Sequence, residues 1–394
     1  MENNIPENIT GIETESKLTV FEATSIIIGH GVGSGILAVP YIASRTSWLD
    51  ILLIVAIAYA INLVMHLMIA ELSLNNGGKQ FIKCFEVELF KGKLKKAFTG
   101  FAFAMLGLSV LLNVSGFIAG SAAVFETWFG WNTRVSMLVY YVIAASVVFI
   151  GMKAVGICEK IAVSAMAVVI GILFVATLRS DMSALPTTLV AYQNLLALYG
   201  CVSFSLSAVM SVPQAVKGLQ GDVRKIRASI IAGTGFNVFL VLLVTFMTLL
   251  GAGSAITQKG ALVDLSYKLG SWVSIVGYLF TLLALSTSLW ANTLNLRDIV
   301  HEQTKIGLRP SWVIASVPSL VLALIGVQSF VKFTRLAGII QVLTGIGIIL
   351  AYNKSRRERS PESPICGFFG SLPFQIIVVT GSLLATVGSA LNVL

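Results

Sequence analysis

The first apolar segment of the chain carries a run of glycines around a histidine. Residues 29–40 read Gly-His-Gly-Val-Gly-Ser-Gly-Ile-Leu-Ala-Val-Pro, with glycine at every second position from 29 to 35. Each glycine costs a helix interior about 1 kcal/mol relative to alanine, and Pro40 removes a further backbone hydrogen bond. We therefore expect this helix to break near its middle, with close packing of small residues against a neighbouring helix as the alternative.

A broken helix exposes backbone groups that can bind ligands. At bilayer depth such a break is tolerated only where it faces protein or a water-filled cavity. The new helix N-terminus after Gly35 suits a carboxylate, and the carbonyl oxygens around Gly29 and Val32 suit a cation. His30 lies inside the break, where it would carry a proton or, alternatively, stay neutral and hydrogen-bond an opened carbonyl.

A second weak segment lies at residues 203–213, which read Ser-Phe-Ser-Leu-Ser-Ala-Val-Met-Ser-Val-Pro. Its serines could satisfy an opened backbone, and Pro213 would disfavour a continuous helix. Ordinary serine-mediated helix packing is the alternative, because this segment contains no glycine. We expect a second break here.

These breaks require a membrane-spanning scaffold, and the composition is that of one. Hydrophobic residues make up 56% of the 394 residues, charged residues only 11%, and the mean hydropathy is +0.89. A soluble domain carries about 25% charged residues. Continuous apolar runs of about 20 residues favour helices over the alternating strands of a β-barrel. We expect eleven spanning helices, at residues 19–44, 49–75, 98–126, 133–151, 157–178, 193–216, 228–250, 272–300, 312–328, 330–352 and 372–394.

The basic residues indicate how these helices are oriented. With a cytoplasmic N-terminus, twenty of the 27 lysines and arginines fall on the inner side. The other seven are Arg45, Arg134, Arg179, Lys259, Lys268, Lys332 and Arg335. This asymmetry follows the positive-inside rule, so the net charge of +9 reports topology and implies no nucleic acid. We expect residues 1–18 to form a cytoplasmic tail.

The two weak helices are the first and the sixth. Since five spans is an odd number, two successive groups of five helices start on opposite sides of the membrane, which is the inverted-repeat layout of many secondary transporters. We expect residues 19–178 to form the first repeat and 193–352 the second. Residues 372–394 would then add an eleventh helix, with the C-terminus outside.

The segment at residues 79–98 places Phe81, Phe85 and Leu89 at intervals of four among several lysines. This spacing predicts a short amphipathic helix on the inner leaflet. Two acidic residues, Glu71 and Glu159, are also expected near the cytoplasmic face, where a carboxylate ordinarily pairs with lysine or caps a helix.

Several of these segments together carry a family resemblance. Residues 31–40 resemble the first-helix motif of the amino acid–polyamine–organocation superfamily, and residues 70–78 (Ala-Glu-Leu-Ser-Leu-Asn-Asn-Gly-Gly) resemble its second-helix ending. Leu285-Ser-Thr-Ser-Leu289 through Asp298, together with eleven spans, is most similar to the amino acid/auxin permease branch, which includes bacterial aromatic amino acid permeases. The resemblance implies an all-α, LeuT-type fold with discontinuous helices 1 and 6.

The resemblance also implies where a substrate binds. The substrate carboxylate and amine would be held by the first break and by carbonyls of the sixth helix. The residues at these positions are Gly31, Val32, Gly33, Ser34 and Gly35 in the first helix, and Phe204, Ser205, Leu206 and Ser207 in the sixth. Asn113 in the third helix is a further candidate, with an interhelical hydrogen bond as its alternative role.

A single coupling cation is the most that this pattern supports. A LeuT-type sodium site would use the carbonyls of Gly29 and Val32 with the hydroxyls of Thr287 and Ser288, which could also serve only as packing contacts. Some relatives have an asparagine where this chain has Ile36, so a second sodium site is not expected. Some proton-coupled relatives carry a lysine midway along the fifth helix, near the position of Gly171 here.

We therefore expect a secondary active transporter of the cell inner (plasma) membrane that imports amino acids, most simply neutral ones, with Na⁺ or H⁺. Residues 251–270 resemble the outer lid of such a transporter. An amino acid-sensing receptor without net transport is one alternative. A metal-ion transporter of the same fold is another, although its Asp-Pro-Gly-Asn and Met-Pro-His motifs are absent. No enzyme and no cofactor beyond the coupling ion are expected, and the partners would be the amino acid, the cation and the bilayer.

Overall fold

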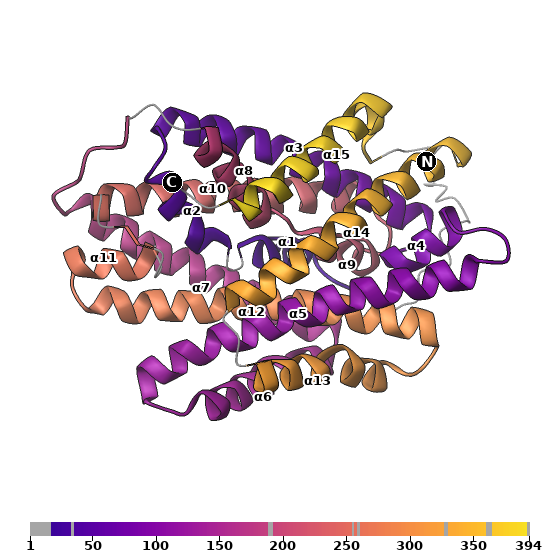
Figure 1. The fold of residues 1–394 in the computed structure, drawn as a ribbon, viewed down its shortest axis with the longest axis horizontal. Coiled ribbons are helices and arrows are strands. Elements are labelled where there is room, and N and C mark those ends of the chain that lie inside the picture. The colour runs from indigo at the N-terminus through magenta and orange to yellow at the C-terminus, as the bar shows by residue number, and fades with distance from the viewer. Residues whose placement is uncertain are drawn as a thin grey trace, which may run out of the picture.

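The computed structural model describes residues 17–32, 35–187, 192–253, 256–257, 261–326, 330–359 and 365–391. Within these residues all regular elements are helices, and Figure 1 shows the long ones lying side by side along the longest axis of the molecule. The all-helical bundle predicted from the apolar runs is confirmed.

The first half of the chain forms seven helices. Their bounds are α1 (Val20–Val32), α2 (Gly35–Ala43), α3 (Trp48–Asn75), α4 (Phe81–Glu88), α5 (Lys95–Phe129), α6 (Thr133–Ile150) and α7 (Met152–Leu178). The second half contains α8 (Tyr192–Ser205), η2 (Val209–Ser211), α9 (Val212–Gly218), α10 (Val223–Ala252), α11 (Ala261–Leu269), α12 (Trp272–Thr304), α13 (Leu308–Gly326), α14 (Phe330–Glu358), η4 (Gly367–Gly370) and α15 (Leu372–Ala390).

Eleven helical segments account for the predicted membrane spans. In the part of the chain that the structure describes, nine helical segments are long and apolar enough to cross a bilayer, the broken segment 192–218 being one of them. The broken pair α1 and α2 and the 29-residue α14 complete the set. The predicted break in the sixth span is present between α8 and α9, whereas the one predicted in the first span falls at residues 33–34, outside the described residues.

The fifth span begins earlier than predicted. Helix α7 starts at Met152, where a start at residue 157 was expected, and Gly151 alone separates it from α6. Gly151 adopts φ 128°, which a residue with a side chain rarely reaches, so one residue turns the chain. Lys153, which suggested a loop, forms an ion pair with Glu22 of α1 at 2.6 Å.

The predicted amphipathic helix at residues 79–98 is shorter than expected. Helix α4 ends at Glu88, and α5 begins separately at Lys95. Its apolar face, with Phe81 and Phe85, is buried and packs against α14 and α12. The helix is therefore docked onto the bundle by this face, and the expectation that the face lies on the lipid was wrong.

Helix α1 lies at the centre of the bundle and α15 at its periphery. Helix α1 packs against α7, α10 and α12 (Figure 1). It is buried along almost its whole length. Helix α15 packs closely on α8, because Gly200 and Gly388 let the two backbones touch: a methyl group on Gly388 would overlap the Leu196 carbonyl. This contact attaches the eleventh helix to the first half of the broken sixth span.

Candidate substrate and ion site

Helix α1 is described to Val32 and α2 from Gly35, so the position of the predicted first break, residues 33–34, lies outside the described residues. The last carbonyls of α1 and the first N–H groups of α2 have no partner within their own helices. The flanking glycines let neighbouring helices approach, because a methyl group on Gly31 would overlap Asn237 Nδ2 and one on Gly35 would lie 2.6 Å from Ser205 Oγ. The glycines therefore serve both a break and close packing, and the two explanations are not exclusive.

The second break lies between α8 and α9 and is held by side chains from other helices. His66 Nε2 of α3 accepts a hydrogen bond from the Ala208 N–H at 3.0 Å, and Asn295 Nδ2 of α12 donates to the Met210 carbonyl at 3.1 Å. Ser205 Oγ instead donates within its own helix, to the Cys201 carbonyl. The expectation that the local serines would satisfy the opened backbone therefore needs correction, at least for Ser205.

The role of His66 fixes its protonation state in this conformation. Because Nε2 accepts from a backbone N–H, that nitrogen carries no proton. Its other nitrogen, Nδ1, lies 3.3 Å from Thr234 Oγ1 and is the donor of the neutral ring. Sequence reasoning missed this residue, although a histidine in the middle of an apolar span is by itself a signal of function.

His30 joins the first break to the second. Its Nδ1 lies 2.9 Å from Ser211 Oγ of η2, and its Nε2 lies 3.5 Å from Asn292 Nδ2 of α12. Its partners are thus side chains, where the neutral alternative predicted an opened carbonyl. The histidine also lines the cavity at the breaks.

A cavity of about 500 Å³ meets both breaks and extends along α5, α8, α12, α14 and α15. The predicted site residues that line it are His30, Gly31, Gly35, Asn113, Phe204, Ser207 and Ser288. The predicted residues that lie in the packed interior next to it are Gly29, Val32, Ser205, Leu206 and Thr287. Gly33 and Ser34 fall outside the described residues.

Three residues of the cavity wall carry buried polar atoms without a hydrogen-bond partner among the described residues. These atoms are Asn113 Oδ1, Ser203 Oγ and Asn292 Oδ1. An unsatisfied buried polar atom costs about 1–3 kcal/mol, so each of these three would be stabilised by a polar partner. The aromatic and apolar residues Phe117 and Met210 complete the nearby wall and were not predicted from the sequence.

The predicted sodium ligands are only partly brought together. Thr287 Oγ1 donates to the Gly29 carbonyl at 2.8 Å and lies 3.0 Å from the Ala284 carbonyl. Ser288, on the next position of α12, faces the cavity, while Val32 is fully buried. The contact between Gly29 and Thr287 therefore joins α1 to α12 next to the break.

The carboxyl group of Glu159 lies beside Gly29, although the sequence placed it near the cytoplasmic face. Glu159 of α7 is fully buried, and neither of its carboxyl oxygens has a hydrogen-bond partner among the described residues. A methyl group on Gly29 would overlap Glu159 Oε2 and lie 2.9 Å from Thr287 Cβ. The expectation of an ordinary capping or paired carboxylate near the cytoplasmic face was wrong for Glu159. Glu71, by contrast, is paired with Arg356 at 3.3 Å.

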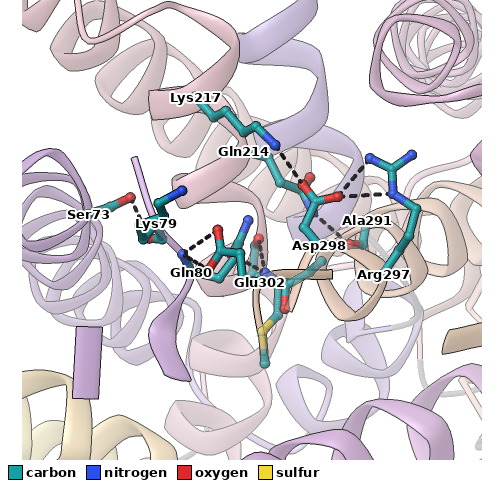
Figure 2. A network of polar contacts seen from close by, with 11 residues as sticks. Ser73, Lys79, Gln80, Gln214, Lys217, Ala291, Arg297, Asp298 and Glu302 are labelled. Carbon is teal, nitrogen blue, oxygen red and sulfur yellow. Dashed lines mark hydrogen bonds and ion pairs between the residues drawn. The ribbon is translucent and has the colours of Figure 1, made fainter. Parts of the chain in front are cut away.

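The far end of α9 is fixed by a polar network, shown in Figure 2. Asp298 of α12 forms ion pairs with Lys217 of α9 at 3.8 Å and with the adjacent Arg297 at 2.7 Å. Gln214 of α9 donates to the Ala291 carbonyl at 3.0 Å (Figure 2). The second half of the sixth span is thus attached to α12 by polar contacts.

The segment before α4 extends this network. The Gln80 N–H donates to Glu302 Oε2 at 3.0 Å (Figure 2). Asn295 donates to Gln80 Oε1 at 2.7 Å. Asn295 also holds the second break, as described above. Asn295 therefore links the segment before α4 to the break between α8 and α9.

Comparisons with known proteins agree with this architecture. The chain matches the sequence model of the tryptophan/tyrosine permease family over residues 16–387, while no curated protein gives a significant match. The structure is similar to that of Mhp1, a nucleobase-cation-symport-1 family transporter in a closed conformation with bromovinylhydantoin bound. The TM-score is 0.66 and the identity 14%, over 97% of this chain and 93% of that chain.

A second similar structure is MhsT in complex with L-phenylalanine, with a TM-score of 0.68 and 14% identity over 96% of this chain and 100% of that chain. At this identity the two likenesses establish the fold, which confirms the predicted LeuT-type architecture. The family match covers nearly the whole chain and is a match to a permease. The chain therefore belongs to the tryptophan/tyrosine permease family and is a LeuT-fold secondary transporter of the membrane, not an enzyme.

Proposed function

We propose that this transporter imports an aromatic amino acid together with a monovalent cation by alternating access. The observation that carries the proposal is the cavity of about 500 Å³ that meets both broken helices. Its volume falls in the usual range for small-molecule sites, about 300–1,000 Å³. The family match supports an aromatic substrate.

The ends of the broken helices suit the charged groups of an amino acid. The N-terminus of α2, at Gly35, presents free N–H groups and the positive end of a helix dipole to the substrate carboxylate. The carbonyls of Gly31 and of the segment from Phe204 to Ser207 would accept from the substrate amine. These groups belong to the first and the sixth spans, which are far apart in the chain. A substrate that contacts both would therefore draw the two breaks together.

The side chain of the substrate would extend into the apolar part of the cavity. Phe117, Phe204 and Met210 line this part, where a flat ring can pack. Asn113 Oδ1 is buried there without a partner, so it can accept from the N–H of an indole or the O–H of a phenol. We propose that this atom favours tryptophan and tyrosine over phenylalanine.

The orientation follows from charge. We place the ends at which α1 begins and α9 ends in the cytoplasm, because most lysines and arginines lie in the segments at these ends. We assign residues 19–178 and 193–352 to the two repeats, with 372–394 as the added helix ending outside. The polar network around Asp298 would then close the inner side and open when α9 moves (Figure 2).

Uptake by reconstituted protein tests the proposal. Liposomes containing the purified transporter should accumulate labelled tryptophan or tyrosine under an inward gradient of Na⁺ or H⁺, and alanine should compete weakly. Binding of tryptophan without accumulation under either gradient would instead indicate a sensor. Failure to bind any of the twenty amino acids would refute the proposal.

Asn113 gives a second, sharper test. Replacing it with leucine, of similar size, removes the acceptor and should weaken tyrosine and tryptophan binding by about 5- to 150-fold relative to phenylalanine. Thr127→Val, an exposed change on the same helix α5, serves as the control and should leave the ratio unchanged. Equal losses for all three amino acids would contradict a role in selectivity.

A further inference from the structure

The most unusual group in the interior is the carboxyl of Glu159, which neither substrate binding nor the polar network uses. It is fully buried at the centre of the bundle, with both oxygens unpartnered among the described residues. A carboxylate in such a place is costly unless a cation neutralises it. The position therefore calls for a positive charge that the neighbouring side chains do not supply.

The surroundings of Glu159 are those of a small cation site. Its Oε2 occupies the space that a side chain at position 29, in the last turn of α1, would need. Thr287 borders the same space, with its Cβ 2.9 Å from the position of a methyl group there, and its hydroxyl donates to the Gly29 carbonyl at 2.8 Å. If this hydroxyl rotated away, the Gly29 carbonyl oxygen and the Thr287 hydroxyl oxygen would both be free to bind a cation. Together with the Glu159 carboxylate, oxygen ligands would then come from α1, α12 and α7.

Fixed charges near Glu159 are few. The helices packed against α7 are α1, α6, α10 and α12. Charged residues of α10 are confined to its first turns and those of α12 to the part from Arg297 onward. The titratable groups on the five helices, outside those two stretches, are Glu22, His30, Arg134, Tyr140, Tyr141, Lys153, Cys158, Lys160 and Tyr278.

Most of these groups have their charge or hydroxyl engaged elsewhere. Lys153 is paired with Glu22 at 2.6 Å, so neither supplies a free charge to Glu159. Tyr141 lies 3.0 Å from Ser316 Oγ, and the Tyr140 hydroxyl accepts from Ser286 at 3.3 Å. His30 adjoins Gly29 in sequence, but its ring contacts Ser211 and faces the cavity.

We propose that Glu159 is the anionic ligand of the coupling cation, with the Gly29 carbonyl and the Thr287 hydroxyl as its neutral partners. The inference rests on the proposed function and names the residue that couples transport to the cation. One monovalent cation enters from outside, neutralises the carboxylate and leaves to the cytoplasm, so the carboxylate is regenerated in each cycle. Because Gly29 lies in the last turn of α1, an occupied site would hold α1 in the form that binds substrate.

Two sources of the charge, Na⁺ and H⁺, share this chemistry and are separated by the experiment. Labelled tryptophan is added outside liposomes that contain the full-length protein, and its accumulation inside is measured with the membrane potential clamped. One arm has an inward Na⁺ gradient at equal pH, and the other has an inward H⁺ gradient without Na⁺. A tenfold gradient of one cation should drive accumulation of up to about tenfold in one of the two arms. The arm that drives accumulation identifies the cation.

Glu159→Gln should abolish accumulation in both arms. It should retain exchange of labelled for unlabelled tryptophan, and this exchange should no longer depend on the cation, because the neutral amide resembles the occupied site. Glu159→Asp keeps the charge and should restore coupled accumulation at a lower rate. Glu86→Gln, which removes a partly exposed carboxyl of α4 paired with Lys83, is the control and should accumulate as the unchanged protein does.

The outcomes separate this inference from the proposed function. Accumulation by Glu159→Gln equal to that of the unchanged protein would overturn the inference. Folded Gln and Asp variants that both lack exchange would also overturn it, since the residue would then serve structure or substrate binding. Absence of both exchange and accumulation in the unchanged protein would instead refute the proposed transport of aromatic amino acids.

Discussion

Replacing His66 tests how the second break is kept open. In the structure His66 Nε2 accepts from the Ala208 N–H, which a continuous helix would direct to the Phe204 carbonyl four residues earlier. His66→Leu removes the acceptor and leaves a buried N–H unsatisfied, at a cost of about 1–3 kcal/mol. In a continuous helix the Ala208 N–H would instead donate to the Phe204 carbonyl. The substitution therefore destabilises the unwound form and not the rewound one.

The expected size of the effect follows from this difference. A penalty of about 1–3 kcal/mol shifts the balance between unwound and rewound forms by about 5- to 150-fold. The apparent Kd for substrate rises by up to the same factor, because only the unwound form offers the carbonyls between Phe204 and Ser207. His66→Gln should lose little, since its amide can both accept from Ala208 and donate to Thr234.

Calorimetric titration of tryptophan into purified protein measures the effect directly. His301→Leu provides a matched control, because this histidine contacts the Ile306 carbonyl near the end of α12 and away from the breaks. We expect the control to bind as the unchanged protein does. A folded His66→Leu variant with a Kd within about twofold of the unchanged protein would refute the reasoning, since a relief of less than about 0.5 kcal/mol could not hold the break open.

Two further substitutions probe the interior. Gly29→Ala would push a methyl group into the Glu159 carboxyl, at an overpacking cost of about 1–3 kcal/mol, and initial uptake should fall sharply. Gly171→Ala on α7 meets open space and should leave uptake unchanged; equal rates for the two variants would contradict the close contact. Asp298→Asn removes the buried carboxylate that pairs with Lys217 and should lower the free energy of unfolding by about 3–5 kcal/mol, measured by denaturation in detergent. Adding Lys217→Met should recover part of that loss, and no difference between the single and double variants would refute the pairing.

The two breaks could be predicted from the sequence because their causes are local. Alternating glycines before Pro40 weaken a helix whatever surrounds it, and the same holds in lesser degree for the segment ending at Pro213. The partners of the second break could not be predicted in this way. His66 and Asn295 reach it from helices far apart in the chain, so their role depends on how α3 and α12 pack.

The position of Glu159 shows how one turn can mislead sequence reasoning. A fifth helix starting at residue 157 places Glu159 in its first turn, at the membrane surface. The single-residue turn at Gly151 lets α7 begin at Met152, so Glu159 lies seven residues inside the helix, about 10 Å from its start. Glycine can adopt a φ of 128°, but its presence in the sequence does not show that it does so.

The contact between α8 and α15 links transport to the surrounding lipid. Since Gly200 and Gly388 bring the two backbones together, we expect a rotation of α8 to displace α15. The outer face of α15 exposes Leu383, Leu384 and Val387, which would lie among the acyl chains. Each cycle would then displace lipid as well as substrate, so bilayer thickness and fluidity would set part of the work that turnover has to perform.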